Sequence, residues 1–257
     1  MEQTKIMVSG CHGKMGQIVC DLINKREDME IFCGFDIATK DTTFPVFNTI
    51  EDLENSCIIP DVIIDFSKPD CTMNILENFA EPLRIPMVIA TTGFSDEKEA
   101  LEKIKLCAQN TLVFLSSNMS YTVSIFEQIL RDLAPKLPGH DIEILEIHHN
   151  RKVDAPSGTA KSLAKAINAY LPKPREIVFN RDSKRNLNEI GISSLRCGGV
   201  VGTHTVIFAT ESETFELTHR ASSREMFAEG ALKAAEYLLK QKSNGISHGF
   251  FNMKNMM

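Results

Sequence analysis

The stretch that decides the fold is VSGCHGKMGQ, residues 8–17. An apolar run, TKIMVS (4–9), leads into it, and an amphipathic pattern predicts a helix over 14–26. Gly10, Gly13 and Gly16 recur every third residue between the two. Backbone N–H groups at a helix start carry the positive end of the helix dipole, and glycines let a phosphate approach them closely. The stretch therefore predicts a strand, a glycine turn suited to phosphate, and a helix.

The turn reads GxxGxxG, whereas the usual dinucleotide spacing, GxGxxG, would place a glycine where this chain has His12. Taken alone, such a turn serves a structural role about as often as it binds a nucleotide. Asp36 ends the second predicted strand, 26 residues after Gly10, where a carboxylate accepts hydrogen bonds from an adenosine ribose. The two features together favour a dinucleotide. No Gly-Lys-Ser/Thr triplet follows, which excludes the Walker phosphate loop.

Cys11 and His12 pose an alternative, a metal or redox site. A metal would need two further ligands, and no companion stands at a suitable spacing, so we expect no metal. A cysteine at a helix N-terminus can have a lowered pKa, which predicts mild reactivity for Cys11.

The remaining pattern divides the chain into two parts. Further apolar runs at 29–35, 60–66, 86–91 and 110–116 alternate with helical patterns at 70–81 and 95–109, which predicts a parallel sheet. After Asn118 the rhythm changes. Helices are expected at 121–135, 158–170 and 224–242, and strands at 141–149, 192–197, 203–209 and 214–219. The short connections between these strands predict a mostly antiparallel sheet packed on helices.

Composition narrows the class of protein. The 257 residues are 43% hydrophobic and carry a net charge of -6, which disfavours a general nucleic-acid binder. The seven cysteines are scattered and show no zinc spacing, as is usual in a reducing compartment. The N-terminus lacks a signal-peptide pattern, and no uncharged apolar run approaches 18 residues. We therefore expect a cytoplasmic protein with no membrane partner.

The densest group of reactive side chains is EIHHNRKVDAPSGTA, residues 146–160. His148, His149, Arg151 and Lys152 lie at a predicted strand end, and Ser157 is a candidate cap for the helix that follows. Cationic side chains facing free helix N–H groups suit a carboxylate, and histidine and lysine can donate protons. A solvated basic loop is the alternative. In an acidic chain an anionic substrate explains the cluster better.

Together the two motifs resemble the dihydrodipicolinate reductase family over essentially the whole chain. The segments that carry the resemblance are VSGCHGKMG (8–16), IDFSKP (64–69), TTGF (91–94), SSNMS (116–120), EIHHNRKVDAPSGTA (146–160), RCGGVVGTHTV (196–206), THRASSREMFAEGAL (218–232) and GFFNM (249–253). The resemblance implies a Rossmann-type nucleotide domain over 1–119 and 223–257. It also implies an α+β domain over 120–222 with a mixed, mostly antiparallel sheet, which binds substrate and forms a homotetramer.

The reaction implied by the resemblance is reduction of 4-hydroxy-tetrahydrodipicolinate, a cyclic dicarboxylate, by NADH or NADPH in lysine and diaminopimelate biosynthesis. His148 would be the proton donor or acceptor and Lys152 the proton donor. His149, Gly158 and Thr159 would hold a substrate carboxylate. The cofactor would contact Gly10, Cys11, His12, Gly13, Lys14, Met15, Asp36, Ala90, Thr91, Thr92, Ser116, Ser117, Asn118 and Met119.

The chain departs from the family at two cofactor positions. Ile37 follows Asp36, where some members have an arginine for the 2'-phosphate of NADPH, and Ala90 replaces a frequent glycine. Lys14 and Lys40 could still meet a 2'-phosphate, so we expect good use of NADH with NADPH also accepted. Two other functions stay open on the sequence: a semialdehyde dehydrogenase with Cys197 as nucleophile, and a regulator that senses NAD(P)H.

Overall fold

The computed structural model describes residues 3–38 and 40–257. Met1, Glu2 and Thr39, which belong to the expected nucleotide domain, lie outside the described residues. The chain divides into two compact units. One comprises Met1–Ser120 with Glu225–Met257, and the other comprises Tyr121–Arg224. Among the described residues, no helix combines the length and apolar character needed to cross a membrane.

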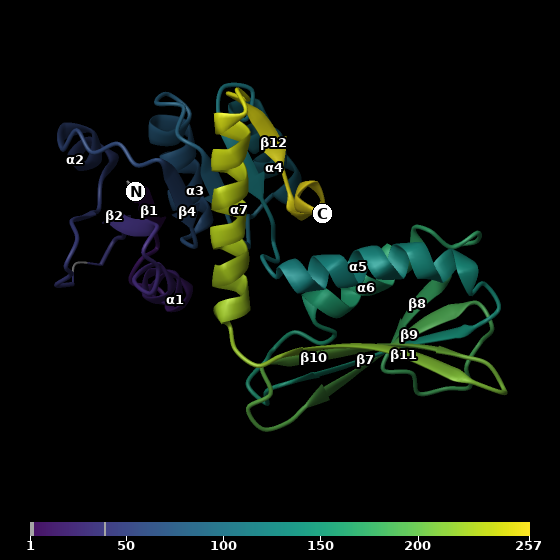
Figure 1. The fold of residues 1–257 in the computed structure, drawn as a ribbon. Coiled ribbons are helices and arrows are strands. Elements are labelled where there is room, and N and C mark those ends of the chain that lie inside the picture. The colour runs from purple at the N-terminus through teal and green to yellow at the C-terminus, as the bar shows by residue number, and fades with distance from the viewer. Residues whose placement is uncertain (1–2, 39) are drawn as a thin grey trace. The chain divides into compact units, whose positions relative to one another are not determined.

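The first unit (Figure 1) is built on a parallel sheet. Its strand order is β12-β6-β5-β4-β1-β2-β3. Its strands are β1 (Thr4–Ser9), β2 (Met29–Phe35), β3 (Val46–Phe47), β4 (Val62–Asp65), β5 (Met87–Ile89), β6 (Leu112–Leu115) and β12 (Gly249–Phe251). The order reverses beside β1, between β4 and β2, which is where open α/β sheets bind their ligands.

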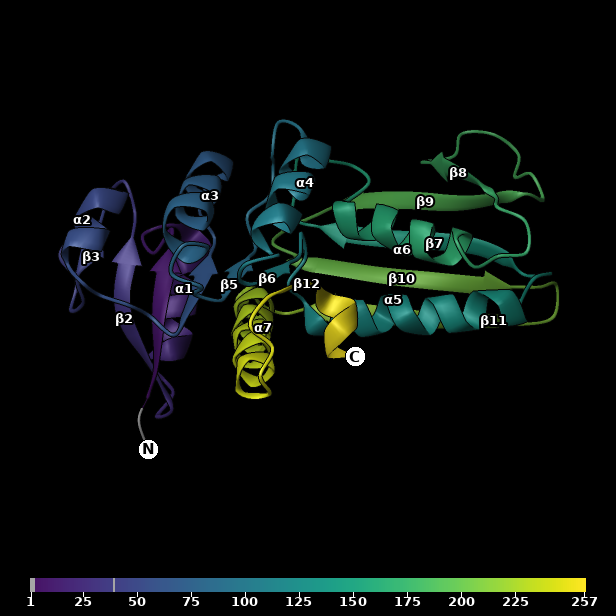
Figure 2. The same cartoon turned by 90° about the horizontal axis from the view of Figure 1, so that it is seen from above.

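Helices cover both faces of this sheet. They are α1 (Lys14–Ile23), α2 (Ile50–Asn55), α3 (Pro69–Ile75), α4 (Glu97–Cys107) and α7 (Glu225–Ser243), with a π-helical turn at Leu76–Ala80 and a 3-10 turn at Met253–Met256. Figure 2 shows α2, α3 and α4 on one face and α1 and α7 on the other. With both faces covered, the central strands read as continuous apolar runs, and Ile6, Met7 and Val8 are fully buried.

The second unit is a five-stranded sheet with the order β11-β10-β7-β9-β8. Its strands are β7 (Asp141–His148), β8 (Glu176–Phe179), β9 (Glu189–Arg196), β10 (Gly202–Ala209) and β11 (Thr214–Ala221), and its helices are α5 (Tyr121–Leu133) and α6 (Gly158–Asn168), with a 3-10 turn at Ala134–Lys136. Figure 1 shows α5 and α6 along one face of this sheet. Residues of β7 alternate between buried and half-buried, as one covered face requires.

The fold class expected from the sequence is confirmed, with differences in detail. The second sheet is mixed, but two of its four pairings are antiparallel and two are parallel, so "mostly antiparallel" was an overstatement. The β7–β9 pair can be parallel because α6 and β8 lie between these two strands in the chain and form the crossover. The pattern also missed β3, α2, β8 and β12, which have two to six residues each and are too short to show a period.

Candidate active site

The glycine turn after β1 has the geometry that the sequence predicts. Gly10 adopts φ +75, and its carbonyl accepts the Gly13 N–H at 2.9 Å. A Cβ atom at Gly10 would lie 2.7 Å from the Phe66 carbonyl oxygen, and one at Gly16 only 2.0 Å from the Gly10 oxygen. Gly13 is the N-cap of α1 and offers no side-chain cap. The backbone N–H groups of the first turn are therefore left for an anion.

Asp36 lies beside this turn at the end of β2. Its Oδ2 accepts the His12 N–H at 2.9 Å, and its Oδ1 accepts the Ala38 N–H at 3.1 Å. A cavity of about 370 Å³ opens here. It is lined by Gly10, His12, Gly13, Phe35, Asp36, Ile37, Ala38, Lys40, Phe66, Ser67, Lys68 and Cys71.

The residues of this cavity fit a dinucleotide. The glycines leave no room for side chains at the turn, and the Asp36 carboxylate can accept ribose hydroxyls. Nε2 of His12 is buried and has no hydrogen-bond partner among residues 3–38 and 40–257. A buried polar atom without a partner is costly, so a ligand atom at this position would satisfy it.

Cys11 corrects one expectation. Burial, with the nearby Asp36 carboxylate, raises the pKa of its thiol to about 11, so the expected lowering is wrong. The side chain turns away from the helix start toward Gly34, where an added Cβ would lie 2.7 Å from Sγ. In the part of the chain that the structure describes, no group of three His, Cys, Asp or Glu side chains could hold a metal ion.

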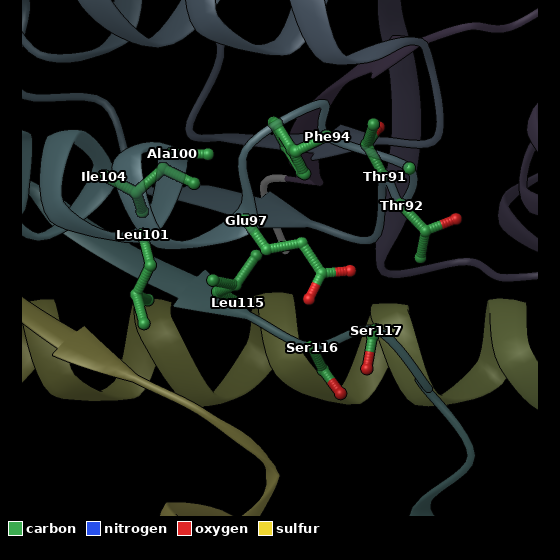
Figure 3. Close-up of a pocket in the computed structure, with 11 residues that line it drawn as sticks. Thr91, Thr92, Phe94, Glu97, Ala100, Leu101, Ile104, Leu115, Ser116 and Ser117 are labelled. Atoms are coloured by element: carbon green, nitrogen blue, oxygen red, sulfur yellow. The ribbon is translucent and has the colours of Figure 1, made fainter. Parts of the chain in front are cut away.

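A second cavity, of about 400 Å³, opens at the ends of β5 and β6. It brings together Thr91, Thr92, Ser116 and Ser117, four of the expected cofactor residues. Figure 3 shows the Glu97 side chain between Thr92 and Ser116. The backbone N–H of Ala90 donates to the Asp65 carbonyl and does not face a ligand. The side chains of Asn118 and Met119 do not line this cavity.

Asp65 is a residue of the first unit that sequence reasoning did not single out. It is fully buried at the end of β4 and accepts three hydroxyl groups, from Ser67 at 2.5 Å, Thr72 at 2.6 Å and Thr91 at 2.7 Å. These bonds tie the turn after β4 to the turn after β5. The clue in the sequence is an aspartate that ends a wholly apolar strand.

In the second unit, His148 ends β7 and is 8% exposed. Its Nδ1 lies 2.5 Å from Oε2 of Glu146, which is fully buried. Burial would raise the pKa of Glu146, but hydrogen bonds from Arg196 and His148 lower it to about 2. An ionised carboxylate only accepts, so Nδ1 is the donor and carries a proton. The other ring nitrogen, Nε2, is left for chemistry.

Arg196 from β9 completes this pair. Its Nη1 and Nη2 donate to Oε2 and Oε1 of Glu146, both at 2.9 Å, and Nη2 also donates to the Asp154 carbonyl at 2.6 Å. The Ser157 N–H donates to Oε1 of Glu146 at 3.1 Å. Sequence reasoning missed both Glu146 and Arg196. Glu146 could have been found, because it stands two residues before His148 on the same face of a strand.

His204 of β10 lies against the other side of His148. The two rings meet edge to face with centroids 5.1 Å apart, and Nε2 of His204 lies 2.9 Å from the Ser157 hydroxyl. Burial, with a contribution from His148, lowers the pKa of His204 to about 4, so this ring is neutral at pH 7. Gly202 leaves space beside the reactive nitrogen, since an added Cβ would lie 3.1 Å from Nε2 of His148.

The loop after β7 carries the other expected residues. Nζ of Lys152 pairs with Oδ1 of Asp154 at 2.8 Å. His149 is half-buried, and its Nδ1 has no hydrogen-bond partner within the described residues. Burial and the neighbouring Arg151 and Arg224 lower the pKa of His149. The cations that keep His149 neutral also create a positive potential around it, which favours binding of an anion.

Ser157 caps α6 as the sequence predicts, because its hydroxyl accepts the Ala160 N–H at 3.1 Å. Gly158 and Thr159 are the first two residues of the helix. Gly158 is exposed, and open space surrounds the position of its missing side chain. Gly158 and Thr159 therefore form an accessible helix start, and His149 lies in the loop that precedes it.

The fold and these sites define the class of protein: a parallel nucleotide-binding sheet joined to an α+β unit with a buried histidine hydrogen-bonded to a carboxylate, as in two-domain NAD(P)H-dependent oxidoreductases. Known proteins narrow this class. The family model "Dihydrodipicolinate reductase, N-terminus" matches residues 4–119, and "Dihydrodipicolinate reductase, C-terminus" matches residues 122–257. The chain therefore belongs to the dihydrodipicolinate reductase family, and it is an NAD(P)H-dependent reductase of lysine and diaminopimelate biosynthesis.

Individual relatives agree with the family model. The chain is 44% identical to a 4-hydroxy-tetrahydrodipicolinate reductase of Clostridium botulinum, covering 91% of this chain and 92% of the relative. It is 40% identical to the reductase of the same name from Caldanaerobacter subterraneus subsp. tengcongensis, covering 98% of each. A dipicolinate-bound dihydrodipicolinate reductase from Paenisporosarcina sp. TG-14 superposes with a TM-score of 0.80 at 25% identity, covering 99% of this chain and 100% of that one.

Family membership weighs against the semialdehyde dehydrogenase and the regulator. Cys197, the nucleophile that the former would need, is an exposed residue whose N–H donates to the His148 carbonyl.

Proposed function

We propose that this chain reduces 4-hydroxy-tetrahydrodipicolinate to tetrahydrodipicolinate, with release of water and oxidation of one NADH or NADPH. The observation that carries the proposal is the cluster at the end of β7. A buried histidine on an ionised carboxylate, a lysine and an accessible helix start lie within one short segment of an acidic chain. The relatives named for this reductase at 40–44% identity support the same substrate.

In this proposal the nucleotide supplies a hydride when bound, and the second unit supplies the protons and the substrate contacts. His148 gives or takes a proton at Nε2, and Lys152 donates a proton from Nζ once the substrate competes with Asp154 for it. His149 and the N–H groups of Gly158 and Thr159 bind one substrate carboxylate. The matching solved structure is bound to dipicolinate, a dicarboxylate, which supports a substrate of this type.

The cofactor-binding residues of the first unit are proposed as follows. The turn from Gly10 to Met15 holds the pyrophosphate through its backbone, and Asp36 binds the ribose. Cys11 and Ala90 contribute backbone or position only, because the Cys11 side chain turns toward Gly34 and the Ala90 N–H donates to the Asp65 carbonyl. The Lys14 side chain is exposed in the first turn of α1, where it can meet a 2'-phosphate. Thr91 and Thr92 serve the nicotinamide end, and Ser116 and Ser117 line the same cavity. Asn118 and Met119 belong to the segment that follows β6 and are proposed as further cofactor contacts.

For the choice of nucleotide we propose good use of NADH with NADPH also accepted. The Asp36 carboxylate repels a 2'-phosphate, and exposed Ile37 offers it no charge. Lys40 lines the same cavity and supplies the compensating cation.

We also propose a cytoplasmic homotetramer assembled through the second unit. Its sheet face opposite α5 and α6 carries the apolar Leu145, Ile147, Leu195 and Ile207, and Leu195 is 48% exposed. Light scattering on the purified protein should give four times the mass of one chain, and a monomer would contradict the assembly alone.

The function is tested with purified protein by following loss of reduced nucleotide on addition of 4-hydroxy-tetrahydrodipicolinate. Calorimetry with pyridine-2,6-dicarboxylate in the presence of NADH, and then of NADPH, measures the dicarboxylate site separately. We expect turnover with both nucleotides and binding of the dicarboxylate. Nucleotide binding with neither turnover nor dicarboxylate binding would favour a regulator.

A further inference from the structure

Glu146 is a carboxylate that the fold keeps in a costly place. It is fully buried on β7, yet it is satisfied by Nδ1 of His148, by both terminal nitrogens of Arg196 and by the Ser157 N–H. A buried ion pair costs several kcal/mol in desolvation per ion, and an apolar pair of similar volume is often at least as stable. Stability alone therefore does not explain why these charges are buried beside His148.

The geometry around His148 indicates what the charges do. The carboxylate accepts a hydrogen bond from the Nδ1–H group, so the neutral ring presents Nε2 as an acceptor. The edge-to-face contact with His204 holds the ring plane, and Gly202 leaves the space beside Nε2 open. The hydrogen bond to Glu146 thus holds Nδ1, and no hydrogen bond within the described residues holds Nε2.

Arg196 makes the arrangement directional. Because Arg196 donates to both oxygens of Glu146, the carboxylate cannot rotate. The Arg196 guanidinium also donates to the Asp154 carbonyl, which connects it to the loop that carries Lys152. The N–H of Ser157, the N-cap residue of α6, also donates to Oε1 of Glu146. One carboxylate therefore joins the acid-base histidine, the lysine loop and the helix start.

We infer that Glu146, clamped by Arg196, is a positioning residue that fixes the tautomer of His148, with the proton on Nδ1 and with Nε2 turned to the substrate. The inference rests on the proposed function for its catalytic consequence. The tautomer itself is a property of the protein without substrate. The inferred tautomer and the proposed function can therefore be disproved independently of each other.

The direct test is nitrogen NMR on protein labelled with 15N in its histidine rings, with His148 assigned by loss of its signals in His148→Gln. In the unaltered protein with a neutral His148 ring, we expect Nδ1 protonated and Nε2 bare. A proton on Nε2 instead would overturn the inference, whether or not the enzyme is active. This measurement needs no Glu146 variant that might fail to fold.

The variant Glu146→Gln keeps the shape and removes the charge. An amide group placed toward Nδ1 becomes a donor, so His148 should move its proton to Nε2 and lose its acceptor. We expect the 15N pattern to invert and kcat to fall by about 10²-fold or more, with the Kd of NADH unchanged. An unchanged 15N pattern, with or without a fall in kcat, would show that Glu146 does not set the tautomer.

Glu143→Gln is the matched control. Glu143 lies on the same strand, three residues earlier and on the opposite face, and it also pairs with two arginines, Arg181 at 2.6 Å and Arg185 at 3.3 Å. Loss of that pair tests the general cost of removing a carboxylate from β7. We expect the 15N pattern and kcat to stay as in the unaltered protein. Inversion in this control as well would assign the effect to the strand rather than to Glu146.

Discussion

The two units build their sites in different ways. The proposed nucleotide site of the first unit is made mainly of backbone: three glycines and a helix start without a side-chain cap, beside one carboxylate that is held by two N–H groups. The site of the second unit is made of side chains that come from β7, β9 and β10 and meet in a buried network around Glu146. Side-chain atoms added to the glycine turn would collide with backbone, whereas removal of one member of the charged network would leave another buried without its partner.

The difference follows from the ligands. A pyrophosphate presents many equivalent oxygens, so fixed N–H groups and a dipole suffice to bind it. A reduction that must deliver protons needs particular nitrogen atoms in particular protonation states, and these are set by neighbouring charges. Substitutions in the two units therefore test this difference, because each should act on turnover alone, on nucleotide binding alone, or on both.

The largest expected effect comes from removing the two side chains that are proposed to donate or accept protons. His148→Ala and Lys152→Ala should each lower kcat by about 10²-fold or more, because general acid-base groups contribute on this scale. The Kd of NADH should change little, since both residues belong to the second unit. Steady-state kinetics and calorimetry give the two quantities.

His140→Ala and Lys173→Ala are the matched controls. His140 immediately precedes β7 at the end opposite to His148, and Lys173 is exposed between α6 and β8. Both controls should retain kcat. Full turnover in His148→Ala and Lys152→Ala would contradict the roles proposed for these two residues.

Gly10→Ala should act on the nucleotide site. Gly245→Ala serves as its control, because Gly245 also has positive φ, +86, but has nothing within 4 Å of an added Cβ. The control pays only the left-handed conformation, about 1–2 kcal/mol of unfolding free energy. In Gly10→Ala the left-handed conformation has the same cost and the added Cβ also collides with the Phe66 oxygen, so this variant should lose more stability and bind NADH more weakly. Equal urea midpoints and equal NADH affinities for the two variants would refute the backbone description.

Acid should weaken the side-chain network. His204 has a pKa lowered to about 4, so between pH 6.5 and about 4 the unfolded chain takes up a proton that the folded unit refuses, and stability falls as the pH falls. Glu146, lowered from 4.5 to about 2, extends the loss from pH 4.5 to about 2, because its folded form stays ionised. Urea midpoints followed by circular dichroism at a series of pH values measure this. His204→Gln should reduce the slope in the upper range only, where His149 and His219, whose pKa values are also lowered, still contribute; an unchanged slope there would show that His204 is not the cause.

The smallest expected effect concerns His12. His12→Ala removes the buried Nε2, and we expect the ratio of KM for NADH to KM for NADPH to change by about two- to tenfold, the worth of one hydrogen bond of about 0.5–1.5 kcal/mol. The kcat value should stay intact, because the ring lies in the cavity that Asp36 and Lys40 also line. Gln17→Ala is a control, since it removes only the bond to the His12 carbonyl. A collapse of turnover in His12→Ala would place His12 in the chemistry instead.

Much of the fold was predictable because long elements carry a period. The runs at 4–9 and 29–35 match β1 and β2 residue for residue, and the pattern at 14–26 contains α1. The tail GFFNM was not recognised as a strand, because three residues show no alternation and β12 exists only through pairing with β6. Helix 70–81 was found, but its change into a π-helical turn at Leu76–Ala80 was not.

The sequence by itself determined the nucleotide turn, the cap at Ser157 and the reactive cluster after β7, because each lies within one continuous segment and follows from local backbone chemistry. Only the tertiary structure decided which side chains control that cluster. Arg196 and His204 lie 50 and 58 residues after Glu146 in the sequence. Glu146 has no local feature that separates it from other strand carboxylates, and only its contacts with Arg196 and His148 in the fold distinguish it. Protonation depends on neighbours in space, and a local motif cannot specify them.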